Sequence, residues 1–287
     1  MLRRALLFIL AMAPAALPAA SLASDAKPKP PETAFSGKLR PDILGVSTDA
    51  TAESARAAFE TRFKGHADAK ADIQQQKLGD SGTSFVAAVN FNLPAGPKQT
   101  GELLSGSFSS PASGNRAYFI ARNLTFAADQ QPAKADMIKE IMGKYGVPTI
   151  VGDQHLYYIY RSGSVISSGT KYKEATALEA IDKPLDPRAA VKLNGETVRG
   201  SCVAVIKRAQ TKAKTLSAMF DEAKGANCDG VLSVQLIPGT PTERVGIAQF
   251  TLLDTKLVVS ATAIDNEAIA ADQNERKAMP KGSAPKL

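Results

Sequence analysis

The 287-residue chain has no tryptophan, only two histidines and only two cysteines. Two histidines, His66 and His155, cannot supply a histidine-rich metal site or the His-Glu-x-x-His helix of zinc proteases. The sequence also has no Gly-x-Ser-x-Gly elbow, no Walker loop and no dinucleotide-binding glycine pattern. We therefore expect a protein that is not an enzyme and that holds neither a cofactor nor a metal ion.

A concentrated positive charge is absent from the central part of the chain, although the net charge is +7. The basic excess lies at the two ends, since residues 41–270 carry 25 basic and 24 acidic side chains. A nearly neutral core lacks the electrostatic footprint of a protein that binds a phosphate backbone. We expect no nucleic-acid partner.

The N-terminus has the three parts of a secretory signal peptide. Arg3 and Arg4 provide positive charge, residues 5–16 are apolar, and Ser21-Leu22-Ala23 supplies small residues for cleavage. A membrane span needs about 20 apolar residues, and two prolines interrupt this stretch. The sequence thus predicts a signal peptide over residues 1–23, no transmembrane anchor after its removal, and a periplasmic or secreted protein.

The only two cysteines, Cys202 and Cys228, would meet oxidising conditions after export. We expect them to form a structural disulfide, worth on the order of 3 to 4 kcal/mol for a loop of this span. A redox pair is the alternative, but the two residues do not form a Cys-x-x-Cys motif.

The hydrophobic pattern predicts an α+β fold of two helix-plus-antiparallel-sheet units, with the helices packed on one face of the sheet. We expect a flexible linker over residues 24–38, a first unit over 39–165, a connection over 166–195, a second unit with the disulfide over 196–277, and a disordered tail over 278–287.

Alternating and helical spacings place the elements of both units. In the first unit we expect a short strand at residues 43–46, a helix capped near Thr51, strands at 85–91, 103–109 and 118–126, a helix from 132 to 145 and a strand at 156–161. In the second unit we expect strands at 198–206, 231–237, 245–253 and 256–264, a helix over 213–224, and a short final helix from Asp265 to about Lys277.

A run of aromatic residues, Tyr157, Tyr158 and Tyr160 followed by Arg161, is the most distinctive candidate for a partner surface. Tyrosine and arginine are enriched where proteins bind one another. On a strand, Tyr158 and Tyr160 share one face and Tyr157 takes the other, so core packing is the alternative.

Three short segments carry a resemblance: Gly45-Val46-Ser47 before the first helix, Phe108-Ser109-Ser110-Pro111 before Ile120-Ala121-Arg122, and Lys144-Tyr145-Gly146-Val147-Pro148 before Leu156-Tyr157-Tyr158. Over residues 41–161 the chain resembles a loose family of exported proteobacterial proteins. Its architecture is similar to the helix-plus-sheet units of β-lactamase inhibitory protein and of the small lipoprotein of the outer-membrane assembly machine. Those relatives bind other proteins on the open face of the sheet, so the resemblance implies a protein-binding module. The chain lacks the lipid-accepting cysteine of the lipoprotein, and no inhibitor contact residue carries over.

These observations predict a non-enzymatic binding or scaffold protein of the cell envelope, with another envelope protein as its partner. Two alternatives stay open. One is an envelope hydrolase that uses carboxylates or His155, and Asp153, two residues before His155, could orient the imidazole as a base. The other is a carrier of a small apolar ligand between helix and sheet.

Overall fold

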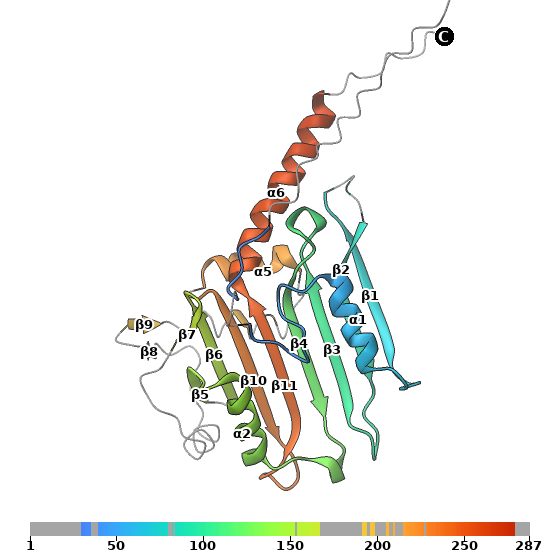
Figure 1. The fold of residues 1–287 in the computed structure, drawn as a ribbon, viewed down its shortest axis with the longest axis vertical. Helices are drawn as coiled ribbons and strands as arrows, with labels where there is room; N and C mark the ends of the chain where they lie inside the picture. The colour runs from blue at the N-terminus through green and yellow to red at the C-terminus, as the bar shows by residue number, and fades with distance from the viewer. Residues whose placement is uncertain are drawn as a thin grey trace, which may run out of the picture.

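The computed structural model describes residues 30–35, 40–79, 82, 84–152, 154–166, 191–193, 196–198, 205–206, 209, 215–226 and 228–278. Within these residues the fold is α+β, as the sequence predicts, and its centre is one large antiparallel sheet (Figure 1). The predicted signal peptide and C-terminal tail lie outside the described residues.

The sheet has nine strands, and its order runs β1-β2-β3-β4-β11-β10-β6-β5, with β7 paired to β6. The strands are β1 (Lys70–Lys77), β2 (Ser84–Leu93), β3 (Gly101–Phe108), β4 (Ala117–Thr125), β5 (Ile150–Gly152), β6 (His155–Arg161), β7 (Ser164–Val165), β10 (Gly230–Pro238) and β11 (Val245–Asp254). A separate pair consists of β8 (Val191–Leu193) and β9 (Glu196–Val198).

The late strands β10 and β11 lie inside the sheet, between β4 and β6 (Figure 1). One row of paired residues crosses all four strands, and it contains Ile120, Leu252, Leu232 and Tyr158. All four side chains are buried in the same cluster. The prediction of two separate units is therefore not confirmed, because strands from both predicted units share one sheet and one core.

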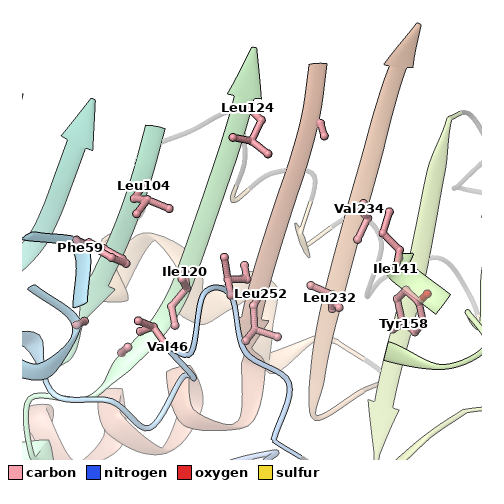
Figure 2. Packing of buried hydrophobic residues seen from close by; sticks show 14 of the residues in the cluster. Val46, Phe59, Leu104, Ile120, Leu124, Ile141, Tyr158, Leu232, Val234 and Leu252 are labelled. Atoms are coloured by element: carbon pink, nitrogen blue, oxygen red, sulfur yellow. The ribbon is translucent and has the colours of Figure 1, made fainter. Parts of the chain in front are cut away.

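Helices cover both faces of this sheet, so the prediction of one covered face is not confirmed either. The helices are α1 (Ala52–Arg62), α2 (Lys134–Tyr145), α5 (Leu216–Lys224) and α6 (Thr255–Ala278), with short 3₁₀ turns η1 (Pro111–Ser113) and η2 (Ala128–Gln130). On the first face, Phe59 of α1 and Ile141 of α2 pack with the row described above (Figure 2). On the second face, Phe119 and Leu253 pack with Met219 of α5 and Leu257 of α6.

The prediction of a strand over residues 256–264 is wrong, because these residues form the first turns of α6. The β-branched pair Val258-Val259 favours a strand locally. The buried positions Leu257, Ala261 and Asp265 instead follow helical spacing and face the sheet. Packing against the second face therefore decides the conformation, and Asp265 lies in the third turn of α6 instead of capping a new helix.

The strand predicted over residues 198–206 does not extend to its expected end, since Val198 is the last residue of β9, while Val205 and Ile206 are helical. Both side chains are buried in the cluster on the second face of the sheet. A short apolar run without turn signals fits a strand and a buried helix equally well, so periodicity alone does not separate them.

A buried carboxylate joins the N-terminal segment to the start of α6. Asp254 accepts hydrogen bonds from Thr33 Oγ1 (2.5 Å) and from the backbone N–H groups of Ala34 (3.1 Å) and Leu257 (2.8 Å). The bond from Leu257 makes Asp254 the N-cap of α6. A fourth, longer bond comes from Thr48 Oγ1 (3.3 Å), so one carboxylate ties together three distant stretches of the chain. Burial raises the pKa of Asp254 to about 6, although these hydrogen bonds oppose the shift.

Candidate binding groove beside the Leu44 turn

The segment before α1 forms a two-residue hairpin turn instead of the predicted strand. Ile43 and Val46 exchange backbone hydrogen bonds of 2.9 and 3.1 Å. Leu44 and Gly45 between them have φ values of 55° and 78°, the left-handed pair of a type I′ turn. Glycine suits this conformation, but leucine in it costs roughly 1–2 kcal/mol.

The last turn of α2 holds the Leu44 turn in place. Lys144 Nζ lies 2.9 Å from Asp42 Oδ1, and Tyr145 donates its hydroxyl to the Asp42 carbonyl at 2.8 Å. Asp42 Oδ1 also accepts the Gly45 N–H at 2.7 Å. Burial raises the pKa of Tyr145, so this hydroxyl stays a neutral donor across the physiological range. The helix end and the turn therefore form one hydrogen-bonded unit.

A groove of about 190 Å³ opens between this turn, α2 and the first face of the sheet. Its apolar lining comes from Ile43, Leu44, Ile141, Tyr145 and Phe250, and its charged lining comes from Arg122, Glu140 and Lys144. Leu44 is 38% exposed, whereas its neighbour Ile43 is 2% exposed. The turn thus holds one apolar side chain out at the mouth of an apolar groove.

Two of the three charged side chains around the groove have a carboxylate partner within the described residues, although one of these carboxylates is shared by two arginines. Arg122 Nε lies 2.7 Å from Oε1 of Glu102, a buried carboxylate that also pairs with Arg62 at 2.6 Å. Lys144 pairs with Asp42. Partial burial lowers the pKa of Lys144, but the interaction with Asp42 opposes this effect, and the pKa is raised overall. Glu140 is exposed and forms no ion pair with any residue that the structure describes. The groove is therefore apolar inside, and Glu140 at its edge is the charged lining residue that has no ion pair with a described residue.

The structure places the predicted tyrosine surface in the core. Tyr157, Tyr158 and Tyr160 are each exposed by 2% or less, Tyr157 on the second face and the others on the first. Tyr158 donates its hydroxyl to the Gly146 carbonyl at 3.1 Å, and its ring lies 5.9 Å from that of Tyr145. Tyr158 therefore supports the end of α2 from beneath, and all three tyrosines are core residues. Arg161, half-buried at the end of β6, lies outside the groove lining.

The histidine proposed as a base in the hydrolase alternative is buried in the structure. His155 is 4% exposed and stacks on the Tyr157 ring with a centroid distance of 5.2 Å. No group of three or more metal-ligating side chains occurs among the described residues. Cys228 is half-buried against the second cluster, while Cys202 lies outside the described residues, so their disulfide stays a prediction.

Comparisons with family models, with curated proteins and with solved structures find no match to this chain. The resemblance to exported helix-plus-sheet proteins thus stays a prediction. In the part of the chain that the structure covers, no helix is long and apolar enough to cross a membrane.

The sequence contains two signals for the Leu44 turn, although the apolar residues around it suggested a strand. Gly45 follows Leu44 directly, and glycine marks positive φ more often than it continues a strand. Asp42 stands three residues before Gly45, the spacing at which its carboxylate caps a turn. Together they predict a turn, although neither predicts that α2 lies against it.

Proposed function

We propose that this protein is an exported, non-enzymatic binding module of the cell envelope that docks another envelope protein in the groove beside the Leu44 turn. The observation that carries this proposal is Leu44 itself, exposed at the groove and held at a positive φ. Backbone conformations of this cost persist where the surrounding structure imposes them, and they gather at functional sites. The Asp42, Lys144 and Tyr145 contacts are what impose it here.

The size of the groove favours an anchor side chain over a free small molecule. Small-molecule pockets are typically about 300–1,000 Å³, and this one is about 190 Å³. Protein interfaces concentrate their binding energy in a few anchors that fill apolar pockets inside a polar rim. The groove has both parts, with Ile141 and Phe250 inside and charged residues around them.

The charge at the rim specifies the partner further. Lys144 has Asp42 as its partner and Arg122 shares Glu102 with Arg62, so among the described charged lining residues Glu140 is the one without an ion pair. The partner we propose presents a large apolar side chain beside a lysine or arginine. The apolar residue would fill the groove, and the basic residue would pair with Glu140 at its edge.

The uncovered part of the second sheet face is a weaker docking surface. Its exposed positions on β1 and β2 are largely polar, among them Lys70, Asp72 and Asn92. Only Leu103 is a large apolar residue there, at 37% exposed. An interface core depleted of charge and rich in apolar contact fits the groove better.

Site-specific photo-cross-linking in the envelope tests this proposal. A photo-reactive phenylalanine analogue placed at position 44 should give one discrete protein adduct, and the same analogue at Lys64, exposed beyond the end of α1, should not. Adding Glu140→Lys should reduce the adduct at position 44 several-fold, because it reverses the free charge. The same adducts at both positions, or none at position 44, would reject the groove as the docking site.

A further inference from the structure

A second cavity, of about 300 Å³, lies on the opposite face of the sheet from the groove. Strands β1 to β4 form one side of it, and the start of α5 and the third turn of α6 form the other. The side chains on which its chemistry depends are Gln74, Asn90, Ser107, Ser110, Tyr118 and Asp265. All six are polar, and the rest of the lining includes the apolar residues Ala87, Ala88, Phe108 and Leu216, so the cavity has a polar and an apolar part.

Asp265 is the charged group of this cavity. It is 8% exposed, and its Oδ1 accepts the hydroxyls of Ser110 and Ser113, both at 2.7 Å. Both serines come from η1 and its N-cap, a segment that packs against α6. Neither a hydrogen bond to Oδ2 nor an ion pair to this carboxylate occurs within the described part of the chain. One oxygen is thus fixed in place and the other is unused.

A buried carboxylate without a countercharge is unfavourable, and two neutral hydroxyls satisfy its hydrogen bonds without balancing its charge. The neighbouring Tyr118 responds to that charge. Burial raises the pKa of Tyr118, and the negative charge of Asp265 raises it further, against a hydrogen bond with Ser107. The phenol therefore stays neutral, and none of the described residues that line the cavity carries a positive charge.

The opposite wall presents acceptors as well. Gln74 Nε2 and Asn90 Nδ2 both donate to Asp72 Oδ2, at 2.9 and 3.3 Å. Because Asp72 accepts one N–H of each amide, the carbonyl oxygens of Gln74 and Asn90 and the second N–H of each amide are the groups left for a guest in the cavity. A guest would then meet a carboxylate oxygen on one side and amide oxygens on the other.

We infer that this cavity is a binding site for a small organic cation, a primary ammonium or a guanidinium group, with Asp265 Oδ2 as its counter-ion. The carbonyl oxygens of Gln74 and Asn90 accept its remaining N–H groups. The volume falls at the lower end of small-molecule pockets and accommodates such a group with a short carbon chain. A metal ion fits less well, because it prefers several charged or imidazole ligands and the cavity has one carboxylate.

The decisive variant is Asp265→Asn, since it removes the charge and keeps the fold. The asparagine Oδ1 still accepts both serine hydroxyls, and the amide nitrogen replaces the unused oxygen. Glu267→Gln is the matched control, because it removes an exposed carboxylate from the same helix two residues away. Asn90→Ala removes one acceptor from the opposite wall and leaves Asp265 unchanged.

Isothermal titration of the purified mature protein with n-butylammonium chloride and with methylguanidinium chloride, against sodium chloride at equal ionic strength, tests the inference. We expect saturable one-to-one binding of at least one cation by the wild type and by Glu267→Gln. Asp265→Asn should weaken it about tenfold to a hundredfold, the range for a hydrogen bond to a charged group, and Asn90→Ala should weaken it several-fold.

No saturable binding by the folded wild type, or equal binding by Asp265→Asn, would overturn the inference and leave a cavity that holds only water. The result is independent of the protein-docking proposal. Asp265→Asn should leave the photo-adduct at position 44 unchanged, because the cavity and the groove lie on opposite faces of the sheet.

Discussion

The carboxyl of Asp254 predicts an unusual pH dependence for the stability of the fold. It is fully buried between the N-terminal segment and the start of α6, and its pKa of about 6 lies about two units above the ordinary value of 3.8. Between these two pKa values the folded state binds more protons than the unfolded state. Stability from this group therefore rises as pH falls through 6, opposite to the behaviour of an ion-paired carboxylate.

The size of the effect follows from the two pKa values. A shift of about two units corresponds to roughly 3 kcal/mol over the whole window, at 1.36 kcal/mol per unit. Between pH 7 and pH 5 the same relation gives a gain of about 1.4 kcal/mol for this single group. The variant Asp254→Asn is the reference, because its amide oxygen can accept from Leu257 while its nitrogen donates to the hydroxyls of Thr33 and Thr48.

Urea unfolding of both proteins at pH 7 and pH 5 provides the measurement. The free energy of unfolding of the wild type, minus that of Asp254→Asn, should increase by about 1.4 kcal/mol on acidification, since other carboxylates cancel in the difference. Glu267→Gln, an exposed carboxylate of the same helix, should show no such change. An unchanged difference, or one that moves the other way, would mean that the hydrogen bonds hold the folded pKa at or below its ordinary value.

Three further predictions concern unfolding in urea at pH 7. Glu102→Gln should lower the free energy of unfolding by about 2–3 kcal/mol, because it leaves Arg122 and Arg62 without their buried partner. The control Glu60→Gln, in an exposed helical pair with Arg56, should change this free energy by less than about 0.5 kcal/mol. Equal effects of the two variants would contradict the burial of Glu102. Leu252→Ala, in the row that joins the early and late strands, should cost about 2–5 kcal/mol, and a loss below about 1 kcal/mol would place this residue outside the core. Gly146→Ala should destabilise the fold by about 1 kcal/mol, because Gly146 has a φ of 82°. Gly143→Ala should stabilise the fold by about 0.5–1 kcal/mol, because Gly143 lies in the interior of α2 with open space around it. If Gly146→Ala were stabilising and Gly143→Ala destabilising, α2 would not end at Gly146.

The sequence predicted well those elements whose signals are local. Thr51 caps α1 as expected, and its hydroxyl accepts the Ser54 N–H at 3.2 Å. The runs of aromatic, β-branched and other apolar residues located β6 and β11 to within one residue at each end. Gly146 ends α2 at a positive φ, as its position after Tyr145 indicates. Each of these predictions depends on contacts within about four residues.

The strand order could not be predicted, because it depends on pairing between residues that lie far apart in the sequence. Leu252 pairs with Ile120 and Leu232 with Tyr158, so the late hairpin enters the middle of the sheet. A rule that neighbouring strands pair describes most sheets but not this insertion. Strand β1 was missed for a different reason, since its eight residues are almost all polar and exposed at the sheet edge.

The candidate sites were the hardest part to predict. Aromatic composition favoured Tyr157 and its neighbours as a surface, but composition does not say which faces of a strand are covered, and helices cover both. Leu44 and Asp265 gave weak local signals for a turn and for a helix cap. Their roles depend on α2 and η1, which reach them from other parts of the chain.

The most direct test of the docking groove is the photo-cross-link from position 44 in the intact envelope, measured with and without Glu140→Lys. The groove geometry predicts a single protein adduct from position 44 that becomes several-fold weaker in the Glu140→Lys background. It predicts no adduct when the analogue is placed at position 64. An adduct that is insensitive to Glu140→Lys, or one that forms equally at position 64, would contradict it.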